Sequence, residues 1–491
     1  MFEQTWNKCE KFKEGFHERY LFLDNCNYEA SLIERWLKTY LLPPFDGSGG
    51  VGGPVATLWA SSPYYVGPYV MNVYGSLMGL IKRKNDKNFK EIYPMLEKFG
   101  EFYIRIQEPT TGIFISNWGE DPFIPAGLVQ QSSVVVALYN LYMTNNLPEF
   151  IKSADLGLKA CLENPFFKSL RNVINQALRF CEALLLNQEI YDHSKYKSLL
   201  REIIQQIKKL QFTEPDLLKG ALPQSLFNPQ IILVYQGKCL YPLVKIWATY
   251  RMEDAIDIAV KLGNFILNTL EMIYKKTGYY LVGGIYIPQR RFSKLIDYFS
   301  KIRKVFPFLS ISLNRLKVLS IKDWIFNIYP IWIARSADTA RGVYWLGKVT
   351  GEKKYIDSAF KILNDILKFK SPLGGIRNTI GFYGFLPSQK NPFVWQDLLP
   401  IPRWNNYVLQ FLNELSVGKP IVILEDLSEN INDEFYTINN EKIVEDKFSV
   451  KCVNNNQRLN WIIKKAKRWG LPFRHVEDWD ELGAAKILKL V

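Results

Sequence analysis

The sequence predicts an all-α fold in which helical hairpins form a closed double ring, followed by a small mixed strand/helix region. Three observations support this prediction. One helical hairpin pattern recurs along the chain, the segments between hairpins are long on one side and short on the other, and the pattern changes after Val417. Such a recurrence is typical of folds in which each unit buries its apolar face against the next.

The recurrence is clearest in three segments aligned on Ala154, Ala259 and Ala359. They are ALYNLYMTNNLPEFIKSA, PLVKIWATYRMEDAIDIA and GVYWLGKVTGEKKYIDSA, and they match without a gap. Each has an apolar first helix, a short polar turn, and a second helix with apolar residues at i, i+3, i+4 and i+7. The copies lie about 100 residues apart, which leaves room for further hairpins between them.

Other segments fill these gaps. The stretches beginning at Met71 and Ser169 have the same helix-turn-helix outline. A helix pair over 7–40 and a late helix, NNYVLQFLNEL from Asn405, would supply the remaining helices of the ring. We therefore expect at least ten helices in two concentric rings around one axis.

The links between hairpins explain why the ring should close. Each follows a second helix and combines glycine with aromatic residues and proline, as in TGIFISNWGEDPFIPAG and LGGIRNTIGFYGFLP. Glycine supplies the backbone conformations with positive φ that such links need. An open solenoid usually has short turns at both ends, so this asymmetry favours a ring with a site on the long-link face.

The chain divides into two parts. Residues 1–415 form the predicted ring domain, with a basic, aromatic insertion at about 286–325. Residues 416–491 contain short strand-like segments such as KPIVILEDL and the basic amphipathic helix NQRLNWIIKKAKRWG. We expect this second part to pack on the ring as an appendage, with a separate binding module as the alternative.

Composition excludes several classes of protein and site. The 491 residues include 48% hydrophobic and 22% charged residues, as in a packed globular protein. No run reaches the ~18 apolar residues that span a bilayer, and the charged N-terminal segment lacks a signal-peptide core. The six cysteines show no CxxC spacing, which predicts buried thiols. These features predict a cytoplasmic protein.

Cofactor sites are not expected. Only three histidines occur, His17, His193 and His475, and they lack metal-ligand spacing. The glycine-rich stretch over 47–54 lacks the GK[ST] ending of a phosphate loop. Any chemistry should therefore depend on carboxylates, tyrosines, arginines and lysines, with no cofactor and no metal.

The hairpins with TGEKKYIDSA- or MEDAIDIA-type turns, and the link that leads into GLVQQSSVVVALYNLY, resemble the six-hairpin glycosidase-like superfamily over residues 20 to 415. This resemblance implies an (α/α)6 toroid. It also implies an activity of the kinds found there, in glycoside hydrolases, unsaturated glucuronyl hydrolases, polysaccharide lyases and uronyl C5-epimerases. No stretch identifies one family among them.

In such a ring the starts of the first helices face the cavity. The alignment makes Gln131, Gln236 and Ser336 equivalent, and likewise Ser133, Lys238 and Asp338. Asp338 lies in the first turn, with Arg341 one turn later on the same face. Asp338 is either a catalytic or substrate-binding group, or a helix cap worth about 0.5 to 2 kcal/mol.

A second candidate group lies in SNWGEDPF, with Trp118, Glu120 and Asp121. A tryptophan face stacks on sugar rings, and a carboxyl group beside apolar surface has its pKa raised toward that of a general acid. The alternative for this segment is an ordinary polar turn.

Further candidates for substrate binding lie in the last links. They are Arg377, Tyr383, Trp395, Asp397, Arg403 and Trp404. An arginine such as Arg403 can hold a substrate carboxylate with two parallel hydrogen bonds. The alternative for each of these residues is a purely structural role.

Half of the net charge of +14 lies in the insertion. It contains nine basic and two acidic residues, a net charge of +7. Its aromatic and basic residues alternate. The insertion is either a lid or a segment that docks on anionic lipid or a lipid-linked acidic glycan, which would place the protein at the membrane periphery. Nucleic acid is disfavoured because no fold signature accompanies the charge.

These observations predict an enzyme that hydrolyses or otherwise modifies an acidic oligo- or polysaccharide. Asp338 and one of Glu120 or Asp121 would be the acid/base pair, with tryptophans as stacking platforms and Arg341 and Arg403 as anion clamps. Uronyl C5-epimerisation or β-elimination, with Tyr383 moving the proton, is the first alternative. A non-catalytic helical-repeat protein that binds a glycan or protein partner is the second.

Overall fold

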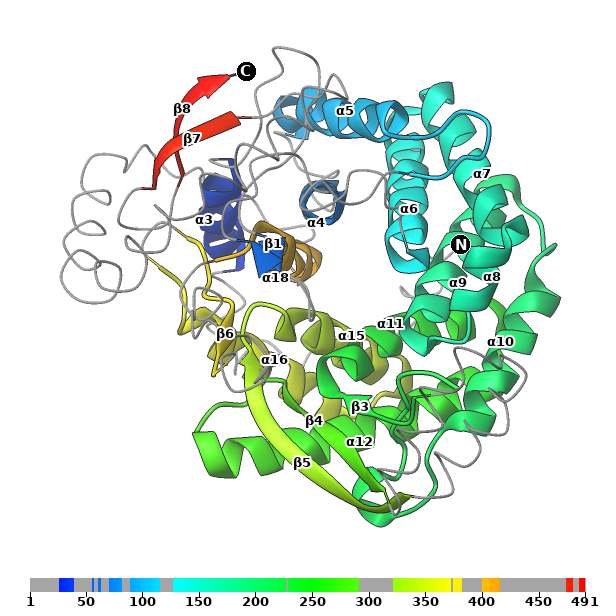
Figure 1. Ribbon diagram of the computed structural model, residues 1–491, viewed down its shortest axis with the longest axis vertical. Helices are drawn as coiled ribbons and strands as arrows, with labels where there is room; N and C mark the ends of the chain where they lie inside the picture. Colours follow the sequence, from blue (N-terminus) through cyan, green and yellow to red (C-terminus); the bar gives the residue numbers. More distant parts are fainter. Residues whose placement is uncertain are drawn as a thin grey trace, which may run out of the picture.

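Among the residues that the structure describes, twelve helices form two concentric rings around a common axis (Figure 1). The computed structural model describes residues 26–38, 55–56, 61–62, 70–81, 89–114, 127–226, 228–290, 321–371, 374–381, 400–415, 474–479 and 485–490. Within these residues the predicted double ring and its (α/α)6 toroid fold are confirmed.

The inner ring contains α4 (Val70–Leu80), α6 (Leu128–Asn145), α9 (Ile174–Tyr191), α11 (Leu233–Tyr250), α15 (Ser336–Thr350) and α18 (Pro402–Leu415). The outer ring contains α5 (Phe89–Arg105), α7 (Pro148–Glu163), α10 (Lys197–Leu210), α12 (Glu253–Thr277), α16 (Lys353–Leu367) and α3 (Cys26–Lys38). Each inner helix contacts both inner neighbours, and α3 packs on α18, so the ring closes through the two ends of the domain. A short helix, α8 (Pro165–Leu170), and the 3-10 turn η4 (Asp216–Leu218) lie between hairpins.

The short turns explain why three hairpins align without a gap. The aligned residues Asn146, Arg251 and Gly351 all adopt the left-handed conformation, with φ of 57°, 53° and 75°. In each hairpin this residue ends the inner helix, and its N–H donates to a carbonyl four residues earlier. The next residue is the N-cap of the outer helix in all three hairpins, so each turn has the same length.

Glycines in the long links lie against the outer helices. Gly112, Gly220 and Gly374 have φ of 73°, 90° and 99°. An added Cβ would meet a carbonyl oxygen of an outer helix at 2.4 Å, 2.2 Å and 2.2 Å, respectively. The predicted need for glycine in these links is thus met by positive φ together with close backbone approach.

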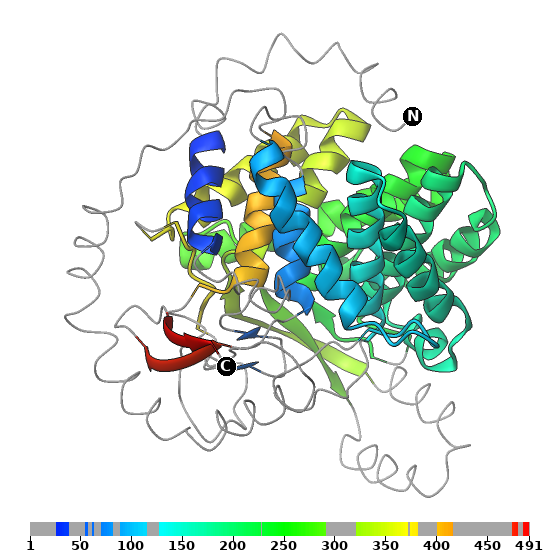
Figure 2. The ribbon, with the colours of Figure 1, turned by 90° about the horizontal axis from the view of Figure 1, so that it is seen from above.

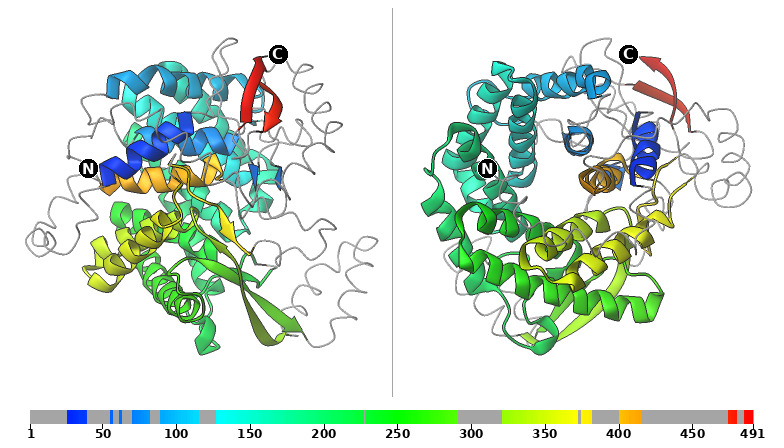
Figure 3. Two further views of the ribbon diagram at one scale, coloured as in Figure 1. Left: turned by 90° about the vertical axis from the view of Figure 1, so that its left-hand side faces the viewer. Right: turned by 180° about the vertical axis from the view of Figure 1, so that it is seen from behind.

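The strands lie on one face of the ring (Figure 2). The largest sheet has the antiparallel order β3 (Ile231–Ile232), β4 (Gly283–Arg290), β5 (Ile321–Trp332) and β6 (Thr379–Ile380). β1 (Val55–Ala56) pairs with β2 (Ser61–Ser62), and β7 (Arg474–Trp479) with β8 (Ala485–Leu490). The side views show the β4–β5 arm extending away from the helices (Figure 3).

This sheet was not anticipated from the sequence. Its two long strands contain both ends of the segment 286–325, which the sequence presented as one inserted unit. Residues 291–320 lie outside the described residues, so the docking of the insertion on an anionic surface stays a prediction. The strand segments expected over 419–453 and the helix expected over 456–470 also lie outside them.

Four cysteines confirm the expectation of buried thiols. Cys26, Cys161, Cys181 and Cys239 are free and buried, and burial raises the pKa of Cys161 and of Cys239 to about 12. Within the described ranges no group of His, Cys, Asp or Glu side chains could hold a metal ion. No helix among these residues is long and apolar enough to cross a membrane.

Candidate functional site

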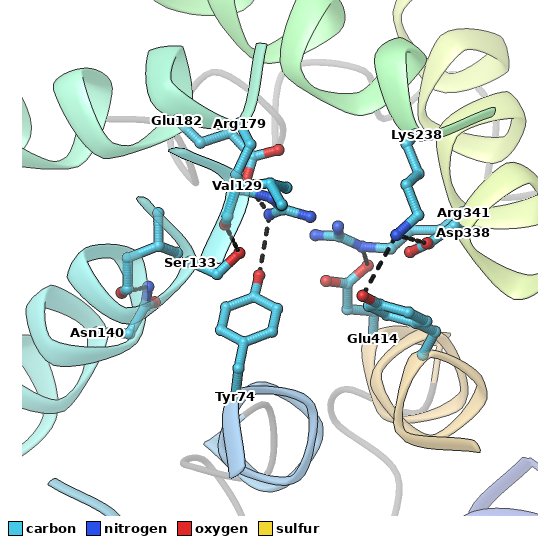
Figure 4. Close-up of polar contacts among 12 residues, drawn as sticks. Tyr74, Val129, Ser133, Asn140, Arg179, Glu182, Lys238, Asp338, Arg341 and Glu414 are labelled. Carbon is cyan, nitrogen blue, oxygen red and sulfur yellow. Dashed lines mark hydrogen bonds and ion pairs between the residues drawn. The ribbon is translucent and has the colours of Figure 1, made fainter. Parts of the chain in front are cut away.

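Charged and phenolic side chains converge on the axis of the ring. Five of the six inner helices contribute, namely α4, α9, α11, α15 and α18, and Figure 4 shows their side chains pointing toward one another. We define the axial cluster as Tyr74, Arg179, Glu182, Lys238, Asp338, Arg341, Tyr407 and Glu414. Inner helices in such a ring are buried on nearly every side, so the charges that they carry need partners within the protein.

Three ion pairs make up the charged part of the axial cluster. Lys238 Nζ lies 3.2 Å from Asp338 Oδ2, and Arg341 Nε lies 2.8 Å from Glu414 Oε2. The third pair joins Arg179 to Glu182 within α9. Exposure of these six side chains is between 6% and 13%, so the pairs are largely removed from water.

The structure distinguishes between the two roles considered for Asp338, a helix cap and a functional group. The residue that caps α15 is Arg335, and no side chain caps this helix end by a hydrogen bond. Asp338 instead reaches across to Lys238 on α11 and forms an ion pair with it. Asp338 is therefore a member of the axial cluster, and the capping interpretation is not supported.

Arg341 is held by two neighbours. Its guanidinium carbon lies 3.6 Å from the centroid of the Tyr241 ring, and Trp345 Nε1 donates to the same Glu414 oxygen that Arg341 contacts, at 3.1 Å. This packing fixes the orientation of the guanidinium. The predicted position of Arg341 beside the axis agrees with the structure (Figure 4).

Two tyrosines of the axial cluster have opposite pKa shifts. Burial raises the pKa of Tyr74 above its usual value, although Arg179, which donates to its hydroxyl at 2.9 Å, opposes the effect. Burial also acts on Tyr407, but Lys238, Arg403 and Arg179 outweigh it and lower the pKa of Tyr407. Lys238 Nζ lies 3.4 Å from the Tyr407 hydroxyl. Groups whose pKa values are driven apart in this way are suited to acid and base roles.

Gln131 and Gln236, expected to bind substrate, are instead bonded to the long links. Gln131 accepts from Phe114 N at 3.0 Å and donates to Gly112 O at 2.8 Å. Gln236 bonds both N and O of Leu222 at 2.8 Å. Ser336, at the aligned position, accepts from Val282 N at 2.9 Å. These side chains anchor each link to its inner helix, and their amide groups are not available to a substrate.

The remaining candidates divide by position. Arg403 and Trp404 begin α18 and are buried, and Trp404 packs edge-to-face on Trp332 with ring centroids 5.2 Å apart. Arg377 is exposed in the link after α16. The predicted residues Trp118, Glu120, Asp121, Tyr383, Trp395 and Asp397 lie outside the described residues.

Sequence reasoning missed five of the eight residues of the axial cluster. Arg179 and Glu182 interrupt the apolar run LRFCEALLL, and a charge in such a run signals an inward-facing pair. Tyr407 and Glu414 were missed because the stretch NNYVLQFLNEL was recognised only as a helix. Tyr74 resembles an ordinary core tyrosine and carries no distinguishing signal.

Comparison with known proteins supports the fold. No family model matches the sequence, and no curated protein matches it. Among solved structures, a sugar epimerase from a ruminal bacterium superposes with a TM-score of 0.52 at 13% identity, over 82% of this chain and 100% of that one. A family 76 glycoside hydrolase (mannosidase) from Bacteroides thetaiotaomicron has a TM-score of 0.51 at 8% identity, over 80% and 98%.

A third similar structure is an unsaturated glucuronyl hydrolase specific for heparin, with a TM-score of 0.50 at 12% identity over 80% of this chain and 97% of that one. All three have the six-hairpin glycosidase-like fold. The resemblance inferred from the hairpins and their links is thereby confirmed at the level of the fold.

Proposed function

We propose that this protein is a carbohydrate-active enzyme that modifies an acidic oligo- or polysaccharide at the axial cluster. The observation that carries the proposal is the convergence of three buried ion pairs and two tyrosines from five inner helices on one axis. The structurally similar proteins, a sugar epimerase, a mannosidase and a glucuronyl hydrolase, act on sugars, which favours the same substrate class here.

Asp338 is the proposed acid/base residue. It lies in the first turn of α15, on the long-link side, and forms an ion pair with Lys238. A hydrolase needs a second carboxyl group, ~5 to 5.5 Å away for retention or ~6.5 to 9.5 Å away for inversion. Glu182 and Glu414 lie at the axis, and Glu120 and Asp121 remain candidates from the preceding link.

Proton transfer by tyrosine is the second candidate function, as in epimerisation or elimination of a uronate. The opposite pKa shifts of Tyr74 and Tyr407 favour it. Tyr407, with its pKa lowered beside Lys238, would remove the proton next to the sugar carboxylate. Tyr74, which keeps its proton, would donate one. In this second candidate function, Tyr407 takes the proton-transfer role that the sequence suggested for Tyr383.

The test is turnover of a panel of acidic and neutral oligosaccharides by the wild type and by Asp338→Asn. A positioned acid or base contributes typically 10²- to 10⁴-fold, so we expect activity to fall by that factor. Because Lys238 loses its partner, stability should fall as well. The double variant Asp338→Asn/Lys238→Met removes the unpaired charge and should recover stability without recovering activity.

A matched control is Asp254→Asn, which removes a carboxylate from an exposed ion pair with Lys208 at 2.6 Å. Exposed pairs contribute little, so both activity and melting temperature should stay near those of wild type. Full activity of Asp338→Asn toward every substrate of the panel would remove Asp338 from the mechanism.

A further inference from the structure

A buried arginine at the start of α15 has no carboxylate partner within the part of the chain that the structure describes. The Arg335 side chain is 4% exposed, and its guanidinium carbon lies over three aromatic rings, at 5.0 Å from Tyr235, 5.2 Å from Trp332 and 5.4 Å from Trp404. Its Nε atom is buried without an acceptor. Among the described residues no carboxylate forms an ion pair with Arg335.

This arrangement leaves donors unsatisfied. A guanidinium has five N–H donors in a planar fork, and aromatic faces attract its charge but do not replace hydrogen-bond acceptors. Trp404 Nε1 is also buried with no acceptor among the described residues. The other buried arginines at the axis, Arg179 and Arg341, are each paired with a glutamate. Arg335 therefore differs from them in that no described residue supplies an acceptor for its Nε atom.

The aromatic cage around Arg335 lies one helical turn from the axial cluster. On each of α11, α15 and α18, a residue at the aromatic cage is followed three positions later by a residue of the axial cluster. The pairs are Tyr235 and Lys238, Arg335 and Asp338, and Trp404 and Tyr407. Residues with this spacing share a helix face and are separated by about 4.5 Å along the axis. A group bound at Arg335 would thus lie about the width of a sugar ring from Asp338 and Tyr407.

From this geometry we infer that Arg335 is the anchor for the carboxylate of a uronic acid residue in the substrate. The carboxylate would accept from the guanidinium fork, and the flanking aromatic rings would pack on the apolar faces of the sugar. The ring attached to that carboxylate would then face Lys238, Asp338 and Tyr407. The inference rests on the proposed function, because it names the substrate class of the same site.

The test is equilibrium binding, measured by calorimetry on the full chain, of a glucuronate-containing tetrasaccharide and of the same tetrasaccharide with its carboxyl groups reduced to alcohols. Wild type should bind the acidic form at least about tenfold more tightly, as expected for hydrogen bonds to a charged group. Arg335→Met should reduce that preference to near unity. Equal affinity of wild type for the two tetrasaccharides would overturn the inference.

Arg251→Met is the matched control. Arg251 lies over Trp247 at 4.4 Å, at the opposite end of α11, so the variant removes an arginine from an aromatic face without touching the cage. It should keep the wild-type preference. If Arg335→Met fails to fold, Arg335→Lys retains the charge but loses the fork, and the preference should still fall several-fold. An unchanged preference in either Arg335 variant would contradict the inference.

Turnover measured in parallel separates this inference from the proposed function. If wild type binds the acidic glycan through Arg335 without converting it, the anchor stands and the enzymatic proposal fails. If wild type converts the carboxyl-reduced glycan as fast as the acidic one, the enzymatic proposal stands and the anchor fails.

Discussion

At the scale of single residues, burying the charges of the axial cluster carries a free-energy cost. The desolvation penalty of two buried charges often exceeds the free energy of their attraction. Replacing a buried ion pair by apolar residues is therefore often neutral or stabilising. Three such pairs lie within one ring here. Stability alone does not account for them, whereas binding and chemistry on a polar substrate do.

Tyr407 provides a pH test of this interpretation. Its pKa is lowered by Lys238 and Arg403 against the opposing effect of burial. If its ionised form is the base, activity rises with pH through that pKa. Lys238→Met removes the largest lowering influence, so the rising limb of the pH–rate profile should move to higher pH, and Tyr407→Phe should abolish the limb. A rising limb that stays in place in Lys238→Met would exclude Tyr407 as the base.

Part of this site was predictable from the sequence. Asp338, Lys238 and Arg341 follow from the hairpin alignment, because polar residues at inner-helix starts face the axis. The same reasoning assigned Gln131 and Gln236 to substrate. Polar residues recur there for a second physical reason, since each link has backbone groups that need a partner. The sequence pattern does not distinguish the two reasons.

At the scale of elements, the long links are held by a repeated combination of one glycine and one polar side chain. Gly220 approaches the carbonyl of Lys261, and Gln236 satisfies the backbone of Leu222 two residues later. Gly112 and Gln131 do the same in the preceding copy. These contacts fix where each inner helix begins, and hence the height of its functional side chains along the axis.

Gly220→Ala tests this construction. Its φ is 90° and the new Cβ would lie 2.2 Å from Lys261 O, so either the link or α12 must shift. The control is Gly278→Ala, which has φ of 75° but no atom within 4 Å of the new Cβ, so it measures backbone strain alone at roughly 1 kcal/mol. Gly220→Ala should cost roughly 1 to 3 kcal/mol more in urea denaturation. Equal losses would mean that the contact with Lys261 is unimportant.

The helices were predictable and the main sheet was not. Helical periodicity is local, and the left-handed caps at Asn146, Arg251 and Gly351 preserve one turn length. The β4–β5 ladder instead pairs residues across the insertion, as in Tyr286 with Phe326. Two glycines and a proline in β4, and one proline in β5, also weaken the local strand signal.

At the scale of the whole molecule, the ring closes through α3. Residues near the two ends of the domain meet there, because α3 packs on α18 and Lys370 forms an ion pair with Glu29. The sequence suggested that an early helix pair and a late helix would complete the ring. It did not indicate that α3 would be the outer partner of α18, because that pairing spans almost the whole domain.

Ile33→Ala tests the closure. Ile33 is fully buried, and deleting such a side chain costs about 2 to 5 kcal/mol. If the ring is one cooperative unit, the entire unfolding transition should move to lower temperature, seen alike by circular dichroism and tryptophan fluorescence. Tyr28→Ala, at an exposed position of the same helix, should have little effect. An unshifted transition in Ile33→Ala would show that α3 does not support the ring.

The most direct test of the central claim is a crystal structure of the protein with a bound acidic tetrasaccharide, using the Asp338→Asn variant to prevent turnover. We predict a sugar ring on the axis, with oxygen atoms within ~3 Å of Lys238 or Tyr407 and on the long-link side of the ring. A glycan bound only on the outer surface would contradict the claim. The groove of about 330 Å³ beside Lys197, Arg201 and Tyr250 is one such place.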